Sequence, residues 1–197
     1  MTQENKAKLV HGLSDFHLAV LLKDDVTGVE YSEVHKLEGA VNVSITPNTE
    51  SNTKYADNIA FAVLNSLSDI DATLSVIDSP ATIKKEVYGQ KQSESGVLFS
   101  NQDDDIKEVA LGFRARTQGG GSRFYWMLKG KPELIGIEHE TDEGAEESKD
   151  AEMNIKFMPL RHNGNWKAEL DSDVVTVDEF FADVIYDEAS ADLALGK

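Results

Sequence analysis

Histidines and carboxylates are the residues of this chain that could support acid–base or metal chemistry. None of the five histidines lies in an HExxH arrangement or beside a GxSxG nucleophile turn. They are His11, His17, His35, His139 and His162. His17 falls in the outward phase of an alternating run, where an exposed or interface histidine is expected. The chain has no cysteine, which excludes thiolate metal sites and cysteine nucleophiles. The residue types therefore predict neither an enzyme nor a cofactor.

An acidic segment, Glu138 to Asp150 (EHETDEGAEESKD), contains residues that could bind a metal ion. A divalent-cation site there would use Glu138, His139, Glu140 and Asp142. Calcium loops place oxygen ligands at fixed odd spacings around a Gly turn, and this run does not match that pattern. We therefore interpret 138–150 as a solvated acidic loop between two strands, and we expect no metal.

Three arginines surround a glycine-rich tip, QGGGS at 118–122. A phosphate-binding loop needs a helix N-terminus after its glycines, and a strand is predicted here instead. Alternation places Arg114, Arg116 and Arg123 together on one face of a hairpin, opposite the apolar residues of the same strands. On that face they could meet an acidic partner subunit, and they are our candidate intersubunit hairpin residues. A solvated hairpin face is an equally good interpretation.

Charge excludes several other function classes. The formal charge of the 197 residues is −17 and the pI is about 4.6. Tight nucleic-acid binding and attachment to anionic membranes both depend on Lys and Arg, so neither is expected. Most of the negative charge lies in 138–150 and 171–197, which leaves a mildly acidic body. With a polar start, Met1 to Lys8, and no long apolar run, the chain is expected to remain in the cytoplasm where it is made.

Period-two alternation in short runs predicts the elements that position these residues. Such runs occur at 16–22, 41–45, 59–67, 70–76, 109–115, 124–128, 153–157 and 166–170. The segment Pro47 to Asn58 (PNTESNTKYADN) is polar and rich in turn formers, so it is predicted as a long functional loop. The run 109–128 predicts a central hairpin, and Asn163-Gly164 predicts a two-residue hairpin turn.

Two short helices complete the prediction. Ser79-Pro80 begins the first, and Gly89 ends it. A capping box at Thr176–Glu179 begins the second, whose apolar stripe runs to Ile185. The fold class is therefore mainly β, an antiparallel β-sandwich or barrel with two short helices and extended loops and arms. Its parts are an N-terminal arm (1–12), a β-sandwich domain (13–188) and a C-terminal tail (189–197).

The order of these features resembles the major tail tube protein of siphoviruses, phages with long non-contractile tails, especially those infecting Gram-positive bacteria. The resemblance covers roughly 10–188 and rests on order and spacing, because no single motif is specific. The matching segments are Leu13–Val20 (LSDFHLAV), Leu37–Ile45, Tyr55–Asn58 (YADN), Ser79–Gly89, Gly96–Leu98 (GVL), Val109–Lys129 (with ALGFRA and YWMLKG), Asn163–Ala168, Phe180-Phe181 and Tyr186.

This resemblance implies a tube subunit. Proteins of the family form homohexameric rings whose β-hairpins line an inner barrel, and the rings stack along the tape measure protein to make the channel for DNA delivery. The implied partners are other copies of the chain, the tape measure protein, the tail terminator and the distal tail proteins. Phage DNA would pass through the lumen without specific binding, and the protein would reside in the virion tail after assembly in the host cytoplasm.

Stacking contacts are expected in the polar loop, the N-terminal arm and the C-terminal tail, because each is polar and poorly able to order alone. Within the loop the candidate stacking residues are Pro47, Asn48, Glu50, Tyr55, Asp57 and Asn58. Deleting Pro47 to Asn58 is then expected to abolish tubes and leave the protein folded.

Other function classes remain open from sequence. A type VI secretion-like tube protein shares the stacked-ring architecture implied above. A carbohydrate-binding β-sandwich would use exposed Trp126, Trp166 or Tyr125 as a stacking platform. A hydrolase would need a polar pocket among acids such as Glu138 or Asp142.

Overall fold

One antiparallel sheet dominates the computed structural model, which describes residues 8–56, 59–78, 80–136 and 150–196. Strands hold 54% of the residues and helices 10%, so the predicted mainly β antiparallel class is confirmed. The strands are β1 (Val10–Asp25), β2 (Gly28–Tyr31), β3 (His35–Lys36), β4 (Ala40–Ala56), β5 (Ile59–Val76), β6 (Lys91–Gln92), β7 (Leu98–Phe99), β8 (Val109–Thr117), β9 (Ser122–Pro132), β10 (Ala151–Phe157) and β11 (Lys167–Ser172). The helices are α1 (Ala81–Glu86), α2 (Val177–Phe180) and α3 (Glu188–Ala194).

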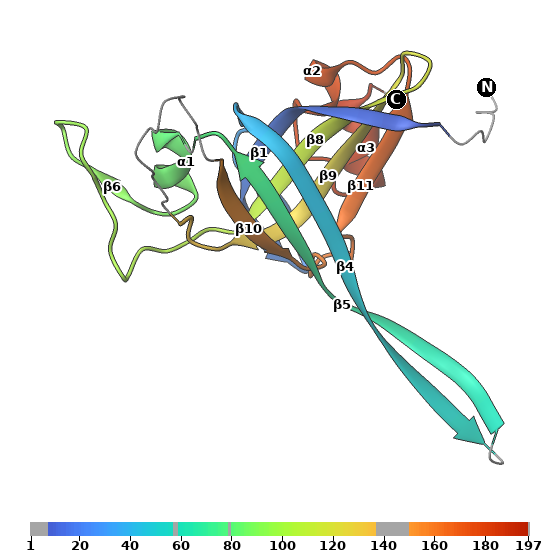
Figure 1. Ribbon diagram of the computed structural model, residues 1–197. Helices are drawn as coiled ribbons and strands as arrows, with labels where there is room; N and C mark the ends of the chain where they lie inside the picture. The colour runs from blue at the N-terminus through green and yellow to red at the C-terminus, as the bar shows by residue number, and fades with distance from the viewer. Residues whose placement is uncertain (1–7, 57–58, 79, 137–149, 197) are drawn as a thin grey trace, which may run out of the picture.

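The strand order β2-β1-β8-β9-β10-β5-β4 describes a sheet that curls back on itself. β4, at one end of this order, contacts β1 near the other end, and Figure 1 shows β4 and β5 crossing over β8 and β9. β9 is long enough to pair with β10 near its end and with β11 near its start. A barrel-like body results, with one interior face and one exterior face.

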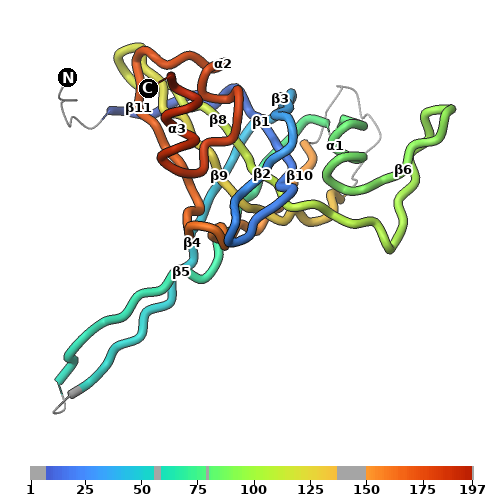
Figure 2. The backbone as a smooth tube through the Cα atoms, turned by 180° about the vertical axis from the view of Figure 1, so that it is seen from behind, coloured from blue at the N-terminus to red at the C-terminus, as the bar shows by residue number. Residues whose placement is uncertain are grey.

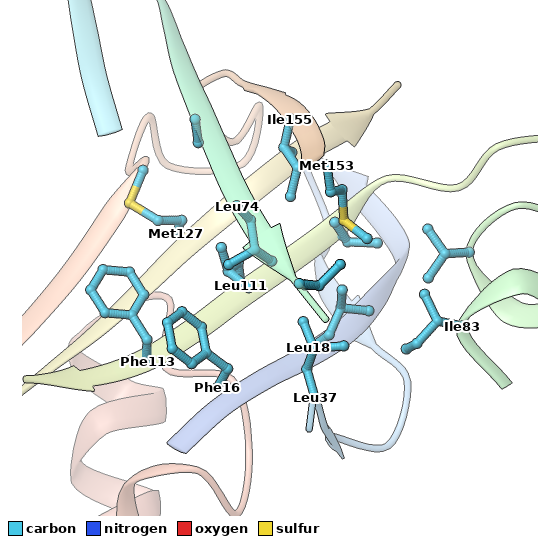
Figure 3. Close-up of a cluster of buried hydrophobic side chains, with 14 of the residues drawn as sticks. Phe16, Leu18, Leu37, Leu74, Ile83, Leu111, Phe113, Met127, Met153 and Ile155 are labelled. Atoms are coloured by element: carbon cyan, nitrogen blue, oxygen red, sulfur yellow. The ribbon is translucent and has the colours of Figure 1, made fainter. Parts of the chain in front are cut away.

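Alternation along the strands supplies a separate core to each face. The interior core draws on β1, β5, β8, β9 and β10, and α1 closes it through Ile83 (Figure 3). The exterior core lies beneath the C-terminal segment, where Phe180 and Phe181 cover Phe124 and Trp126. Gly112 permits this covering, because a Cβ there would lie 2.8 Å from side-chain atoms of both Phe181 and Trp126. The aromatic C-terminal segment therefore forms the second layer of the fold.

Two predicted helices are present, and a third was not predicted. α1 lies within the predicted span, with Ile83 and Val87 buried as expected, whereas Ser79 lies outside the described residues. α2 has the predicted capping box but lasts only one turn, and Val184 and Ile185 reach the core from irregular chain.

The predicted C-terminal tail (189–197) contains most of a helix that was not predicted, α3. The Asp187 carboxylate accepts a hydrogen bond from the Ser190 backbone, and Ser190 completes the capping box. The short Ala-rich run Glu188–Ala194 is thus stabilised at its first turn.

Three further boundaries differ from the predictions. Residues 59–67 and 70–76 form one strand, β5, because a bulge opposite Asn48 keeps the pairing with β4 unbroken. Asn163-Gly164 does turn the chain, but it does not join a two-residue hairpin, since β10 and β11 pair with different parts of β9. Val10 and His11, predicted in the N-terminal arm, begin β1 and pair with β8.

A buried ion pair links the end of β1 to β9 and to the turn after β10. Lys129 of β9 donates to the Asp24 carboxylate at 2.7 Å, and their side chains are 8% and 3% exposed. The backbone N–H groups of Arg161 and His162 also donate to Asp24. Burial by itself raises the pKa of Asp24, but these hydrogen bonds outweigh it and hold that pKa below its usual range. The network fixes the turn after β10 against the end of β1.

Replacing Lys129 with Met is expected to lower the free energy of unfolding by about 3–5 kcal/mol, because Asp24 is left buried without its cation. Lys131→Met, an exposed lysine on the same strand, is the control and should cost less than about 0.5 kcal/mol. Urea unfolding measures both. Since folding lowers the pKa of Asp24, its contribution is present above the usual carboxyl pKa and is lost as pH falls through the lowered value. Equal stabilities of the two variants at pH 7 would refute this role.

Candidate assembly surface

The β4–β5 hairpin extends far outside the body of the molecule (Figures 1 and 2). β10 pairs with β5 only along Ile70–Val76. Beyond that stretch, residues 49–56 pair with 59–67 and, within the described chain, with no other strand. We call 49–56 and 59–67 the projecting hairpin. Both of its outer edges therefore present backbone N–H and C=O groups that another strand can pair with.

The β5 strand of the projecting hairpin is strongly apolar in its far half. The sequence IAFAVL at 59–64 carries four large apolar side chains, and each is more than half exposed, as is Tyr55 on the opposite strand. Phe61 is 79% exposed. A six-residue run of high β-propensity without charge or proline is an aggregation hazard when it is left open at an edge. Such a surface is expected on a protein whose partner covers it.

A β-bulge distributes these side chains over both sides of the ribbon. Lys54 pairs with Ala62 and Tyr55 pairs with Ala60, so Phe61 has no directly opposed residue. Val63 and Leu64 are neighbours along β5 and so point to opposite faces. The ribbon therefore offers apolar contacts on each face in addition to its open edges.

A polar cluster marks the root of the projecting hairpin. Asn48 donates to the carboxylates of Asp69 and Asp71 at 2.8 Å each. Lys156 contacts the remaining oxygen of each carboxylate, at 2.9 Å and 3.2 Å. Hydrogen bonds from Lys156 and Asn48 hold the pKa of Asp69 below its usual range. We call Asn48, Asp69, Asp71 and Lys156 the root clamp.

The predicted loop Pro47 to Asn58 is wrong for its described part. Pro47, Asn48, Glu50 and Tyr55 all lie in β4, whereas Asp57 and Asn58 lie outside the described residues. Polar residues form a strand here because β5 supplies a partner for their backbone groups along nearly the whole segment. Pro47 is tolerated because β4 is an edge strand.

Sequence reasoning identified 59–67 as a strand but missed its exposure. The available signal was the unbroken apolar run 59–64 in an otherwise alternating chain. In an antiparallel sheet with one solvated face, an alternating pattern is the norm, so a continuous run indicates either burial on both faces or an interface.

The three arginines do not share a face, which corrects the prediction. Arg114 pairs with Phe124, and Arg123 pairs with Ala115, so the register places Arg123 on the interior side and Arg114 on the exterior side. The prediction failed because alternation along single strands does not give the register across the turn.

The arginines also differ in their partners. Arg114 contacts Asp15 at 2.6 Å. Arg123 makes a two-pronged contact with Asp171 at 2.7 Å, and this holds the pKa of Asp171 below its usual range. Arg116 is exposed. Two of the three arginines thus hold neighbouring strands of their own chain.

The residues proposed for other chemistry do not converge. Trp126 is fully buried, and the Lys167 ammonium lies over the rings of Tyr125 and Trp166, so these three residues do not form an open aromatic platform. His17 lies on the exterior face, in the predicted outward phase, but it is half-buried because its ring stacks on Phe181 with centroids 4.2 Å apart, and burial lowers its pKa.

Several predicted features lie partly or wholly outside the described residues. The cation-site residues Glu138, His139, Glu140 and Asp142 are among them. The described residues contain no group of three or more side chains arranged to hold a metal ion. Among the helices that the structure describes, none has the length and apolar character needed to cross a membrane.

No protein-family model matches the chain, and neither does any curated protein.

Phe61→Asp is expected to leave the free energy of unfolding within about 0.5 kcal/mol of the unmodified protein, because the side chain is already exposed. It should reduce self-association strongly. Val26→Asp provides a matched control, since Val26 is 88% exposed at the β1–β2 turn and the charge change is the same. Sedimentation velocity over a concentration series measures both. Equal self-association of the two variants would exclude the hairpin as the contact surface.

Proposed function

We propose that this chain is a tube-forming structural protein, the major tail tube protein of a siphovirus, which assembles into homohexameric rings that stack into the channel for DNA delivery. The projecting hairpin carries this proposal, because its apolar surface and open edges require a partner. The resemblance in the order of segments supplies the specific class. In this account the protein is no enzyme and resides in the virion tail after assembly in the host cytoplasm.

A contact between the hairpin of one copy and the body of the next would favour a tube over a closed dimer. The projecting hairpin and the body are different surfaces, so a hairpin placed on the body of the next copy is a head-to-tail contact. Head-to-tail contacts generate rings when the rotation closes and open stacks when it does not. Strand pairing between neighbouring hairpins would satisfy the open edges within a ring.

The acidic composition is consistent with a channel for DNA. Each chain carries a formal charge of −17, so a hexamer carries about six times that charge. A lumen without rows of Lys and Arg gives phosphates nothing to hold, which allows DNA to pass without specific binding. The tape measure protein, the tail terminator and the distal tail proteins are the proposed neighbours inside and at the two ends of the tube.

Shortening the hairpin symmetrically tests the proposal better than deleting 47–58, which would remove the outer part of β4 and leave residues 59–67 of β5 without a paired strand. Replacing Glu50–Ser66 with Asn-Gly joins Thr49 to Leu67, which already pair, through a two-residue turn. No residue of either core lies in the removed segment, so the body should unfold cooperatively near the original temperature. Electron microscopy should show no rings or tubes. Normal tubes from this variant would overturn the assignment.

Salt should promote assembly. Copies with a charge of −17 repel one another, whereas 49–67 contains only three charged residues, Glu50, Lys54 and Asp57. Raising ionic strength from about 0.05 M to about 0.5 M shortens the screening length several-fold and leaves apolar contacts intact. Light scattering should therefore show a lower critical concentration at high salt. A higher critical concentration would indicate that ion pairs hold the copies together.

A further inference from the structure

The root clamp joins three strands at the point where the hairpin leaves the body. Asn48 belongs to β4, Asp69 and Asp71 to β5, and Lys156 to β10. Each of the four carboxylate oxygens contacts either the Asn48 amide or the Lys156 ammonium. The contacts form a closed cycle in which one amide and one cation hold two carboxylates that would otherwise repel each other.

The position of this cycle coincides with an irregularity in the sheet. Between the pairs Pro47–Ile70 and Thr49–Leu67, Asn48 alone faces the two residues Ser68 and Asp69. Such a bulge bends a strand and increases its local twist. The pairing of β10 with β5 also ends here, at Phe157 and Ile70. The bulge is therefore the place where a two-stranded ribbon can swing relative to the body.

A small rotation at this root moves the apolar end of the hairpin far. The eight residues Thr49–Ala56 extend about 26 Å at about 3.3 Å per residue. A rotation of about 20°, similar to the twist between neighbouring strands, displaces the end by about 9 Å. That displacement exceeds the spacing between two paired strands, so it would change which surface of a neighbouring copy the hairpin meets.

We propose that the root clamp sets the direction of the projecting hairpin and thereby the spacing and angle between successive copies in the assembly. The effect on the spacing and angle between copies rests on the proposed function, whereas the effect on the direction of the hairpin concerns a single chain. Lys156 and Asn48 are positioning residues in this account, because they act through the hairpin and lie outside its apolar half. Removing either one frees the bulge to adopt several angles.

Pulsed electron paramagnetic resonance tests this directly, because the chain has no native cysteine. Spin labels on Lys54→Cys in the outer part of the hairpin and Arg116→Cys in the body occupy exposed strand positions. Arg116 is near the end of β8, and this end of β8 lies to one side of the line of the hairpin (Figure 1), so a swing of the hairpin about its root changes the distance between the two labels. Excess unlabelled protein suppresses distances between copies. The labelled protein should give one narrow distance distribution.

Lys156→Met should broaden that distribution at least twofold, and Asn48→Ala should do so without changing the charge. Lys131→Met is the matched control, since Lys131 pairs directly with Lys156 on β9 and the charge change is identical. Circular dichroism verifies that each variant is folded. An unchanged width in both clamp variants overturns the proposal.

The proposed function and the role of the root clamp can be refuted independently. If the unmodified protein forms neither rings nor tubes, the proposed function fails while the distance measurement still decides the role of the clamp. If rings form but the clamp variants keep the narrow distribution, only the clamp proposal fails. Where the variants assemble, electron microscopy should show irregular spacing between rings, and regular spacing would contradict the clamp's role in assembly.

Discussion

The continuous pairing of β4 with β5 is the constraint on which the rest of this molecule depends. Inside the body, β5 has neighbours on both sides and contributes Ile70 and Leu74 to the interior core. Outside the body, and among the residues that the structure describes, the same two strands pair only with each other. β5 is therefore part of the core at one end and an exposed apolar strand at the other. Because the strand is continuous, folding of the barrel also fixes the apolar end in an exposed position.

In a monomer, the projecting hairpin exposes apolar surface to water without any compensating contact from a partner. An isolated two-stranded ribbon is marginally stable in water, and exposed apolar strands favour edge-to-edge association. At the root, the contacts of the root clamp link both hairpin strands to β10, across the bulge at which the ribbon could otherwise swing. Anchoring of this kind makes sense when the direction of the hairpin matters to a neighbour. The net charge of −17 meanwhile makes separate copies repel one another.

The sequence predicted the parts of the fold that depend on local pattern. Strict alternation identified the central hairpin of β8 and β9, and the Thr176 capping box located α2. The prediction from sequence failed for Pro47–Ala56. This polar segment was expected to be a loop, but it forms a strand because its backbone pairs with β5. The prediction failed also at Arg123, whose face depends on the register across a turn and not on the strand that carries it. α3 was missed because a short Ala-rich run gains its helix from one capping aspartate, Asp187.

The central claim is that this chain assembles with itself through the projecting hairpin, and direct imaging of the unmodified protein tests it most simply. Negative-stain electron microscopy of the purified full chain, at increasing concentration and at high salt, should show rings that stack into tubes of constant width. Single particles of monomer size at every concentration, with sedimentation confirming the monomer, would contradict the account.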